Sequence, residues 1–137
     1  MDHLKVTKFI NAPANKVWEG LTKPELVKQY FFGTNVESTW EKGAEIFFRG
    51  EYEGKKYEDK GIIISVEAGK HVSYEYWSSM SGEPDLPENY REVSYDLAPK
   101  DEGTEVTITQ ETTPEKKEHS EQNWNKVLDG LKKTVEH

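Results

Sequence analysis

Three tyrosines and a glutamine are the polar side chains whose positions could form a binding site. Tyr74 and Tyr76 lie two residues apart in the segment 71–77, where apolar and polar residues alternate. Tyr95 and Gln110 hold equivalent positions in two later alternating segments. This pattern is typical of strands with one buried face, so all four side chains are predicted to point inward. Buried phenol and amide groups need hydrogen-bond partners. They either bond to the backbone or reach the rim, or they are the few polar groups of a mostly apolar small-molecule pocket.

Residues suited to metal binding or catalysis are sparse. The histidines are scattered without a second ligand at metal-binding spacing, and the sequence has no cysteine. No Gly-x-Ser-x-Gly nucleophile motif is present, although a Ser-His-Asp arrangement built from distant positions stays open. Glu75, Glu92 and Asp96 have the outward parity of solvated side chains. We therefore predict no metal, no cofactor and no catalytic residue, which favours a binding protein over an enzyme. The four histidines are His3, His71, His119 and His137.

Composition limits the class of protein. A chain of 137 residues suits one domain, so residues 1–137 are predicted to form a single unit with its own core. A net charge of −8 argues against binding to nucleic acid or to anionic membranes. The N-terminal sequence does not read as a signal peptide, and no apolar stretch is long enough to cross a membrane. Together with the absence of cysteine, this predicts a cytoplasmic protein.

A long helix near the C-terminus is the element on which the predicted sheet can close. Its apolar residues fall four, three and four positions apart and so share one helical face, which Val127 widens: Trp124, Leu128, Leu131 and Val135. Thr113 and Pro114 form a start signal, a capping hydroxyl followed by a proline in the first turn. Residues 115–122 are polar, so the first turns are expected to project beyond the core or to fray.

A strand and two short helices are predicted at the N-terminal end. Lys8 interrupts the apolar side of the strand, which indicates a bulge or, alternatively, an inward lysine that pairs with an acidic ligand. The helices begin near Ala12, and Thr22 to Glu25 reads as a capping box for the second one.

Six strands joined mostly by short turns follow from Asn35, which predicts an antiparallel meander. In the segment 57–66, Ile62 and Ile64 are placed on the inward face. The connection 78–89 is too long for an ordinary hairpin, and such loops are often lids, binding loops or disordered. Its apolar anchors are Met80 and Leu86.

Short matches in this order resemble a known superfamily. They are Ala12-Pro13 with Val17-Trp18, Leu21-Thr22 and Pro24-Glu25, then Gly103-Thr104 with Val106-Thr107-Ile108, and finally Trp124 with Leu128-Asp129, Leu131-Lys132 and Glu136. The chain resembles the helix-grip superfamily (birch-pollen-allergen-like, START-related, SRPBCC), and within it the family named for the activator of the heat-shock-protein-ninety ATPase. It departs from the pattern at Tyr30, where relatives often have tryptophan, and at Asn123, where many have glycine.

The resemblance implies an α+β fold. A curved antiparallel sheet of about seven strands would wrap around the long C-terminal helix, with two short helices after the first strand and often a cavity inside. The candidate ligand-binding residues share the inward faces of sheet and helix: Phe48, Tyr74, Tyr76, Tyr95, Ile108, Gln110, Trp124 and Leu128.

The predicted function is to bind or carry a small hydrophobic molecule in that cavity. Two alternatives stay open. One is a chaperone-ATPase-activator-like regulator or stress-response protein, whose partner would be a chaperone. The other is a polyketide-cyclase-like enzyme, which would use Tyr74, Tyr76 and Tyr95 as hydrogen-bond donors.

Overall fold

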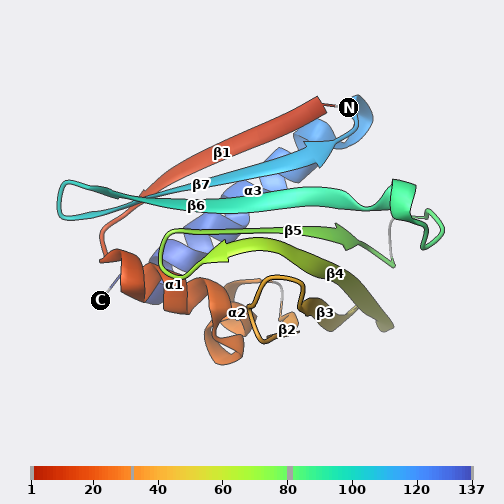
Figure 1. Ribbon diagram of the computed structural model, residues 1–137, viewed down its shortest axis with the longest axis horizontal. Coiled ribbons are helices and arrows are strands. Elements are labelled where there is room, and N and C mark those ends of the chain that lie inside the picture. The colour runs from red at the N-terminus through yellow and green to blue at the C-terminus, as the bar shows by residue number, and fades with distance from the viewer. Residues whose placement is uncertain (1, 32, 80–81, 137) are drawn as a thin grey trace.

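A seven-stranded antiparallel sheet wraps around a long C-terminal helix in the computed structural model, which describes residues 2–31, 33–79 and 82–136 (Figure 1). In chain order the elements are β1 (Asp2–Ile10), α1 (Ala14–Thr22), α2 (Pro24–Tyr30), β2 (Asn35–Ser38), β3 (Glu45–Tyr52), β4 (Lys55–Glu67), β5 (His71–Trp77), the 3-10 helix η1 (Pro87–Asn89), β6 (Arg91–Lys100), β7 (Gly103–Thr112) and α3 (Pro114–Val135). The predicted α+β fold and its order of elements are confirmed.

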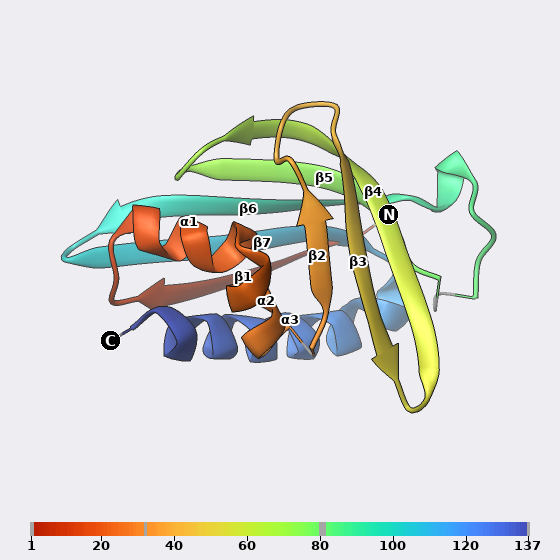
Figure 2. The same ribbon diagram turned by 90° about the horizontal axis from the view of Figure 1, so that it is seen from below.

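The strands follow the spatial order β1-β7-β6-β5-β4-β3-β2, so the first strand pairs with the last. The other neighbours in the sheet are also neighbours in sequence, as expected for a meander. The sheet curves over α3 (Figure 2). Helix α2 packs between α3 and β2, whereas α1 contacts α2, β6 and β7. Both short helices contact α3.

The core lies between the concave face of the sheet and one stripe of α3. The stripe is the predicted one: Trp124, Val127, Leu128, Leu131 and Val135 are buried. Tyr74, Tyr95 and Gln110 are buried as predicted, and buried residues alternate along β6 and most of β7, whereas on β5 the intervening Ser73 is buried as well. Because α3 is straight and the sheet is curved, the space between them is not filled evenly along the helix.

The first strand has no bulge. Its register with β7 runs without a break from Asp2 opposite Thr112 to Ile10 opposite Thr104, so the bulge expected at Lys8 is wrong. Lys8 lies on the helix side of the strand, and its Nζ pairs with Asp129 Oδ1 of α3 at 2.6 Å. The inward lysine is therefore neutralised by the protein's own carboxylate.

The inward face of β4 is shifted by one residue from the prediction. Ile63 is 1% exposed, whereas Ile62 is 53% exposed and Ile64 is half-buried. The pairing of β4 with β5 changes register between Ile63 and Ser65, which moves the side chains that follow to the other parity. Three consecutive isoleucines leave the parity of this strand undetermined by sequence.

The capping box expected at the start of α2 is also wrong. Thr22 does not cap α2; its Oγ1 donates to Trp18 O at 2.9 Å, and Lys23 is the N-cap residue. Helix α3 is regular from Pro114 onward. In the connection 78–89, η1 forms near the end, Leu86 is exposed, and Met80 lies outside the described residues.

Candidate functional site

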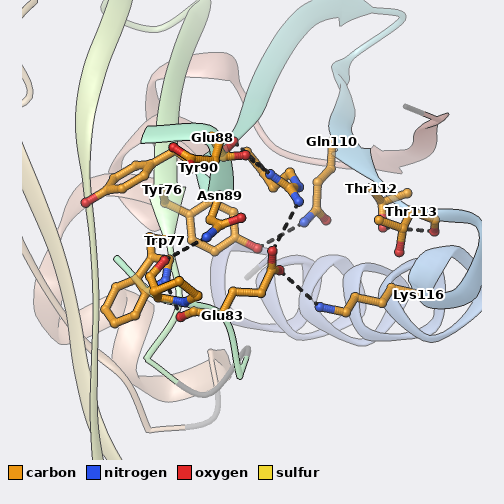
Figure 3. Close-up of polar contacts among 12 residues, drawn as sticks. Tyr76, Trp77, Glu83, Glu88, Asn89, Tyr90, Gln110, Thr112, Thr113 and Lys116 are labelled. Carbon is orange, nitrogen blue, oxygen red and sulfur yellow. Dashed lines mark hydrogen bonds and ion pairs between the residues drawn. The ribbon is translucent and has the colours of Figure 1, made fainter. Parts of the chain in front are cut away.

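Gln110 is the polar centre of the interior. It lies on β7 and is buried against the underside of α3. The indole Nε1 of Trp124 donates to its Oε1 at 2.5 Å. The Nε2 of Gln110 donates to the hydroxyl of Tyr76 at 3.0 Å (Figure 3). An indole N–H can only donate, so this contact fixes which end of the amide faces the helix. The pair of bonds holds β7, β5 and α3 at a defined separation.

The middle of the interior is filled by aromatic rings. The hydroxyls of Tyr74 and Tyr95 are hydrogen-bonded at 2.6 Å, and their rings meet edge to face. The ring of Tyr95 also meets that of Trp124 edge to face, and Phe48 packs on Tyr74. The space left among these rings and α2 is about 10 Å³, too small for any ligand.

A real cavity lies beneath the N-terminal half of α3. It has a volume of about 150 Å³ and an apolar wall with polar groups set into it. Its lining is Phe31, Tyr76, Gln110, Ser120, Asn123, Trp124 and Val127. A second hollow of about 170 Å³ shares Tyr76, Gln110 and Ser120 with the first and continues toward the loop between β5 and β6. Together they form one site with an uncharged inner part and a charged outer part.

The outer part carries three charged side chains. Glu83, from the loop after β5, lies between Arg91 at the start of β6 and Lys116 in the first turn of α3 (Figure 3). Its carboxylate oxygens are 3.6 Å from Arg91 Nη2 and 3.6 Å from Lys116 Nζ. The side chain of Arg91 is only 17% exposed, whereas that of Lys116 is 54% exposed.

The phenols of the interior are protonated at neutral pH. Burial raises the pKa of Tyr76 to about 12, with the nearby charge of Asp59 adding to the effect and the bond from Gln110 opposing it. Burial likewise raises the pKa of Tyr74 well above its ordinary value and raises that of Tyr95. These groups therefore act as neutral hydrogen-bond donors and acceptors.

The predicted site residues fall into three groups. Tyr76, Gln110 and Trp124 line the cavity. Phe48, Tyr95 and Ile108 line the closed remnant beside it. Tyr74 and Leu128 are buried in the packed core.

Several lining residues were not among the predicted ones. Ser120 lies four positions before Trp124 on α3 and Asn123 one position before it, so they extend the cavity wall toward the helix start. Their polar character hid this in the sequence, whereas Val127 belongs to the predicted apolar stripe but was not among the predicted site residues. No sequence pattern marked Phe31 or the charged residues of the outer part as site residues, because the fold brings them together from distant segments.

The open question of a Ser-His-Asp arrangement has a structural answer on the opposite face of the sheet. Ser65 Oγ lies 3.0 Å from His71 Nε2, and His71 Nδ1 lies 2.6 Å from Asp96 Oδ1. Ser73 Oγ extends the chain to Ser65 at 2.7 Å. None of the four cavities described here is lined by these residues. We interpret them as a cross-strand hydrogen-bond network of β4, β5 and β6.

The outer face carries a hollow of about 340 Å³, the largest of the four described here, between β4, β5 and the 85–90 segment. Its wall includes Glu45, Lys60, Glu75 and Asp85. Lys60 and Asp85 pair with each other across it at 2.6 Å, so these two charges already satisfy each other. The inner cavity, by contrast, has uncharged hydrogen-bonding groups in its wall, those of Tyr76, Gln110 and Trp124.

Two searches of the described residues gave negative results. In the ranges 2–31, 33–79 and 82–136, no group of three or more histidine, cysteine, aspartate or glutamate side chains could hold a metal ion. No helix in these same ranges has the length and apolarity needed to span a membrane.

Comparisons with known proteins place the fold in context. The solution structure of ChR145 from Cytophaga hutchinsonii is 45% identical, with 97% of this chain and 92% of that one covered at a TM-score of 0.83. The Aha1 dimer from Colwellia psychrerythraea is 20% identical, with 99% and 97% covered and a TM-score of 0.75. Ara h 8.0201, with the birch-pollen-allergen-like fold, is 11% identical over 98% and 97%, with a TM-score of 0.74. No curated protein matches the chain.

The family comparison covers nearly all of the sequence. The profile described as "Activator of Hsp90 ATPase homolog 1-like protein" matches residues 11–136, from the end of β1 to the end of α3. The resemblance found in the short sequence matches is thereby confirmed, and it supports a ligand-binding or regulatory role in general terms. The chain belongs to the activator of Hsp90 ATPase homolog 1-like family, within the SRPBCC helix-grip superfamily.

Proposed function

We propose that this protein binds a small, largely apolar molecule in the cavity beneath the N-terminal half of α3. The observation that carries the proposal is a cavity lined by the rings of Phe31 and Trp124 together with the hydrogen-bonded chain Trp124–Gln110–Tyr76. Ligand sites are usually apolar clefts in which a few fixed polar groups set the orientation of the ligand.

The volume supports a ligand with a small apolar part. A cavity of about 150 Å³ is the size that holds one benzene-like ring. The rest of the ligand would lie in the outer hollow of about 170 Å³. No part of the ligand fits in the middle of the interior, because the aromatic cluster around Tyr95 fills it.

Tyr76 supplies the polar contact. Among the described residues, the hydrogen bond found at its hydroxyl is the one it accepts from Gln110. Its own hydrogen is therefore available to an acceptor in the cavity. A ligand oxygen near the ring would satisfy it.

Titration of the protein with two matched probes tests the proposal. We expect 3-phenyl-1-propanol and propylbenzene both to shift the indole N–H resonance of Trp124, because each places a ring against that residue. Gln110→Leu removes the amide but keeps the volume of the side chain, so it should weaken binding of the alcohol more than binding of the hydrocarbon. Asn125→Leu, at an exposed position of α3, is the control. If neither probe moves the Trp124 resonance, the proposal is wrong.

A second candidate function is the regulation of a chaperone ATPase, and it is favoured by the family match itself. Its test is independent of the cavity. Purified protein should raise the ATPase rate of an Hsp90-type chaperone in a dose-dependent way. An unchanged rate together with no co-purification would exclude it. Either function is compatible with the reducing cytoplasm, since a chain without cysteine forms no disulfides.

A further inference from the structure

The charged side chains in the outer part of the site are two cations and one anion. Two cations, Arg91 and Lys116, share the single carboxylate of Glu83 at 3.6 Å each. Other ion pairs of this protein are much closer, for instance Lys8 with Asp129 at 2.6 Å. Charge-assisted hydrogen bonds have lengths of about 2.7–2.9 Å, so Glu83 is only loosely bound by both cations.

The guanidinium of Arg91 does not depend on Glu83 for its position. Its Nη1 donates to the backbone carbonyls of Glu88 at 3.0 Å and Tyr90 at 3.2 Å. A largely buried positive charge would therefore stay in the wall of the hollow if Glu83 turned away. An uncompensated charge of this kind is costly and favours capture of another anion.

Glu83 can turn away without movement of its backbone. Its carbonyl accepts a hydrogen bond from the indole Nε1 of Trp77 at 3.0 Å, which holds the main chain in place. The side chain is one-third exposed, so solvent can receive its carboxylate. The carboxylate of Glu83 thus occupies the position between the two cations that another anion would take, and it would compete with that anion.

We infer that the ligand of this site carries a carboxylate, which replaces that of Glu83 between Arg91 and Lys116 while its apolar part enters the inner cavity. This inference rests on the proposed function and specifies the ligand class. The inner and outer hollows share Tyr76, Gln110 and Ser120, so one molecule can reach both. Their volumes of about 150 and 170 Å³ fit a single apolar ring joined to a carboxylate by a short chain.

The test compares 3-phenylpropionate with the neutral 3-phenyl-1-propanol, using the Trp124 indole resonance as readout. Wild type should prefer the carboxylate. Glu83→Gln removes the competitor and should tighten binding of the carboxylate roughly tenfold, with little change for the alcohol. A gain of affinity cannot come from misfolding. Glu88→Gln is the matched control, because Glu88 is an exposed acid of the same loop that contacts Arg91 only through its backbone carbonyl.

Loss-of-charge variants complete the test. Arg91→Gln should abolish the preference for the carboxylate, and Lys116→Gln, at a more exposed position, should reduce it while leaving the fold intact. Lys117→Gln is the control for the helix. Equal affinities for both probes in wild type, with no gain in Glu83→Gln, would overturn the inference and leave the proposed function standing. A silent Trp124 resonance with both probes would overturn the two together.

Discussion

The two halves of α3 cover interiors of opposite character. Beneath the C-terminal half, α1 and α2 pack so closely that a methyl group on Gly130 would lie 2.6 Å from Cβ of Tyr30. Beneath the N-terminal half there is a cavity, and polar side chains line it. The C-terminal half therefore anchors the helix, so the N-terminal half can stand away from the sheet and leave a cavity beneath it. A binding site next to a tightly packed region needs no large motion to stay open.

The largest effect is expected where the packing is tightest. Leu131→Ala removes a fully buried side chain and should lower the free energy of unfolding by about 2–5 kcal/mol. Asn123→Ala, in the cavity wall, should change it by less than about 0.5 kcal/mol. Urea denaturation of both variants measures the contrast, and equal losses would contradict the division of the helix into two halves.

A smaller effect of overpacking is expected at the same end. Gly130→Ala improves helix propensity but forces the new methyl group against Tyr30, whose hydroxyl is held by Gly20 O at 2.6 Å. The net loss should be about 1–2 kcal/mol. Ser120→Ala, beside the cavity, meets no such obstacle. It should leave the free energy of unfolding unchanged or raise it by about 0.3 kcal/mol. A stabilising Gly130→Ala would show that α2 can yield.

The smallest effect concerns the ion pair between Lys8 and Asp129. The lysine holds the pKa of Asp129 below its ordinary value, so the stability from this pair is present above the unfolded-state pKa and is lost as the pH falls through the folded one. Both side chains are at least one-third exposed, so Asp129→Asn should cost about 0.2–1 kcal/mol at pH 7 and less in high salt. The difference from wild type should vanish in acid, and a difference that persists at pH 2 to 3 would contradict this origin.

The parts that sequence could predict are those with a strong period. The apolar stripe of α3 and the alternation on β5, β6 and β7 placed Trp124, Tyr95 and Gln110 correctly, because each period admits one face. Three successive isoleucines on β4 admit two faces, and the bulge decides between them.

The charged mouth of the site could not be predicted for a different reason. Glu83, Arg91 and Lys116 belong to a loop, a strand and a helix, and only the register of β6 and β7 under α3 brings them together. Nor does periodicity reveal whether inward side chains leave space. The side chains of Tyr74 and Tyr95 fill the space around them, whereas Tyr76, two residues after Tyr74 on β5, borders a cavity.

The pairing of β1 with β7 also constrains how the chain can acquire its fold during synthesis. The first strand leaves the ribosome early, yet its hydrogen-bonded neighbour in the described sheet begins at Gly103. The backbone N–H of Asn11 is likewise bound at 2.7 Å by the carboxylate of Glu136, 125 residues later. Contacts of such separation delay folding, since a long loop must close before they can form. Until then the apolar side of β1 has no partner, and a nascent chain stalled before β7 would offer it to chaperones.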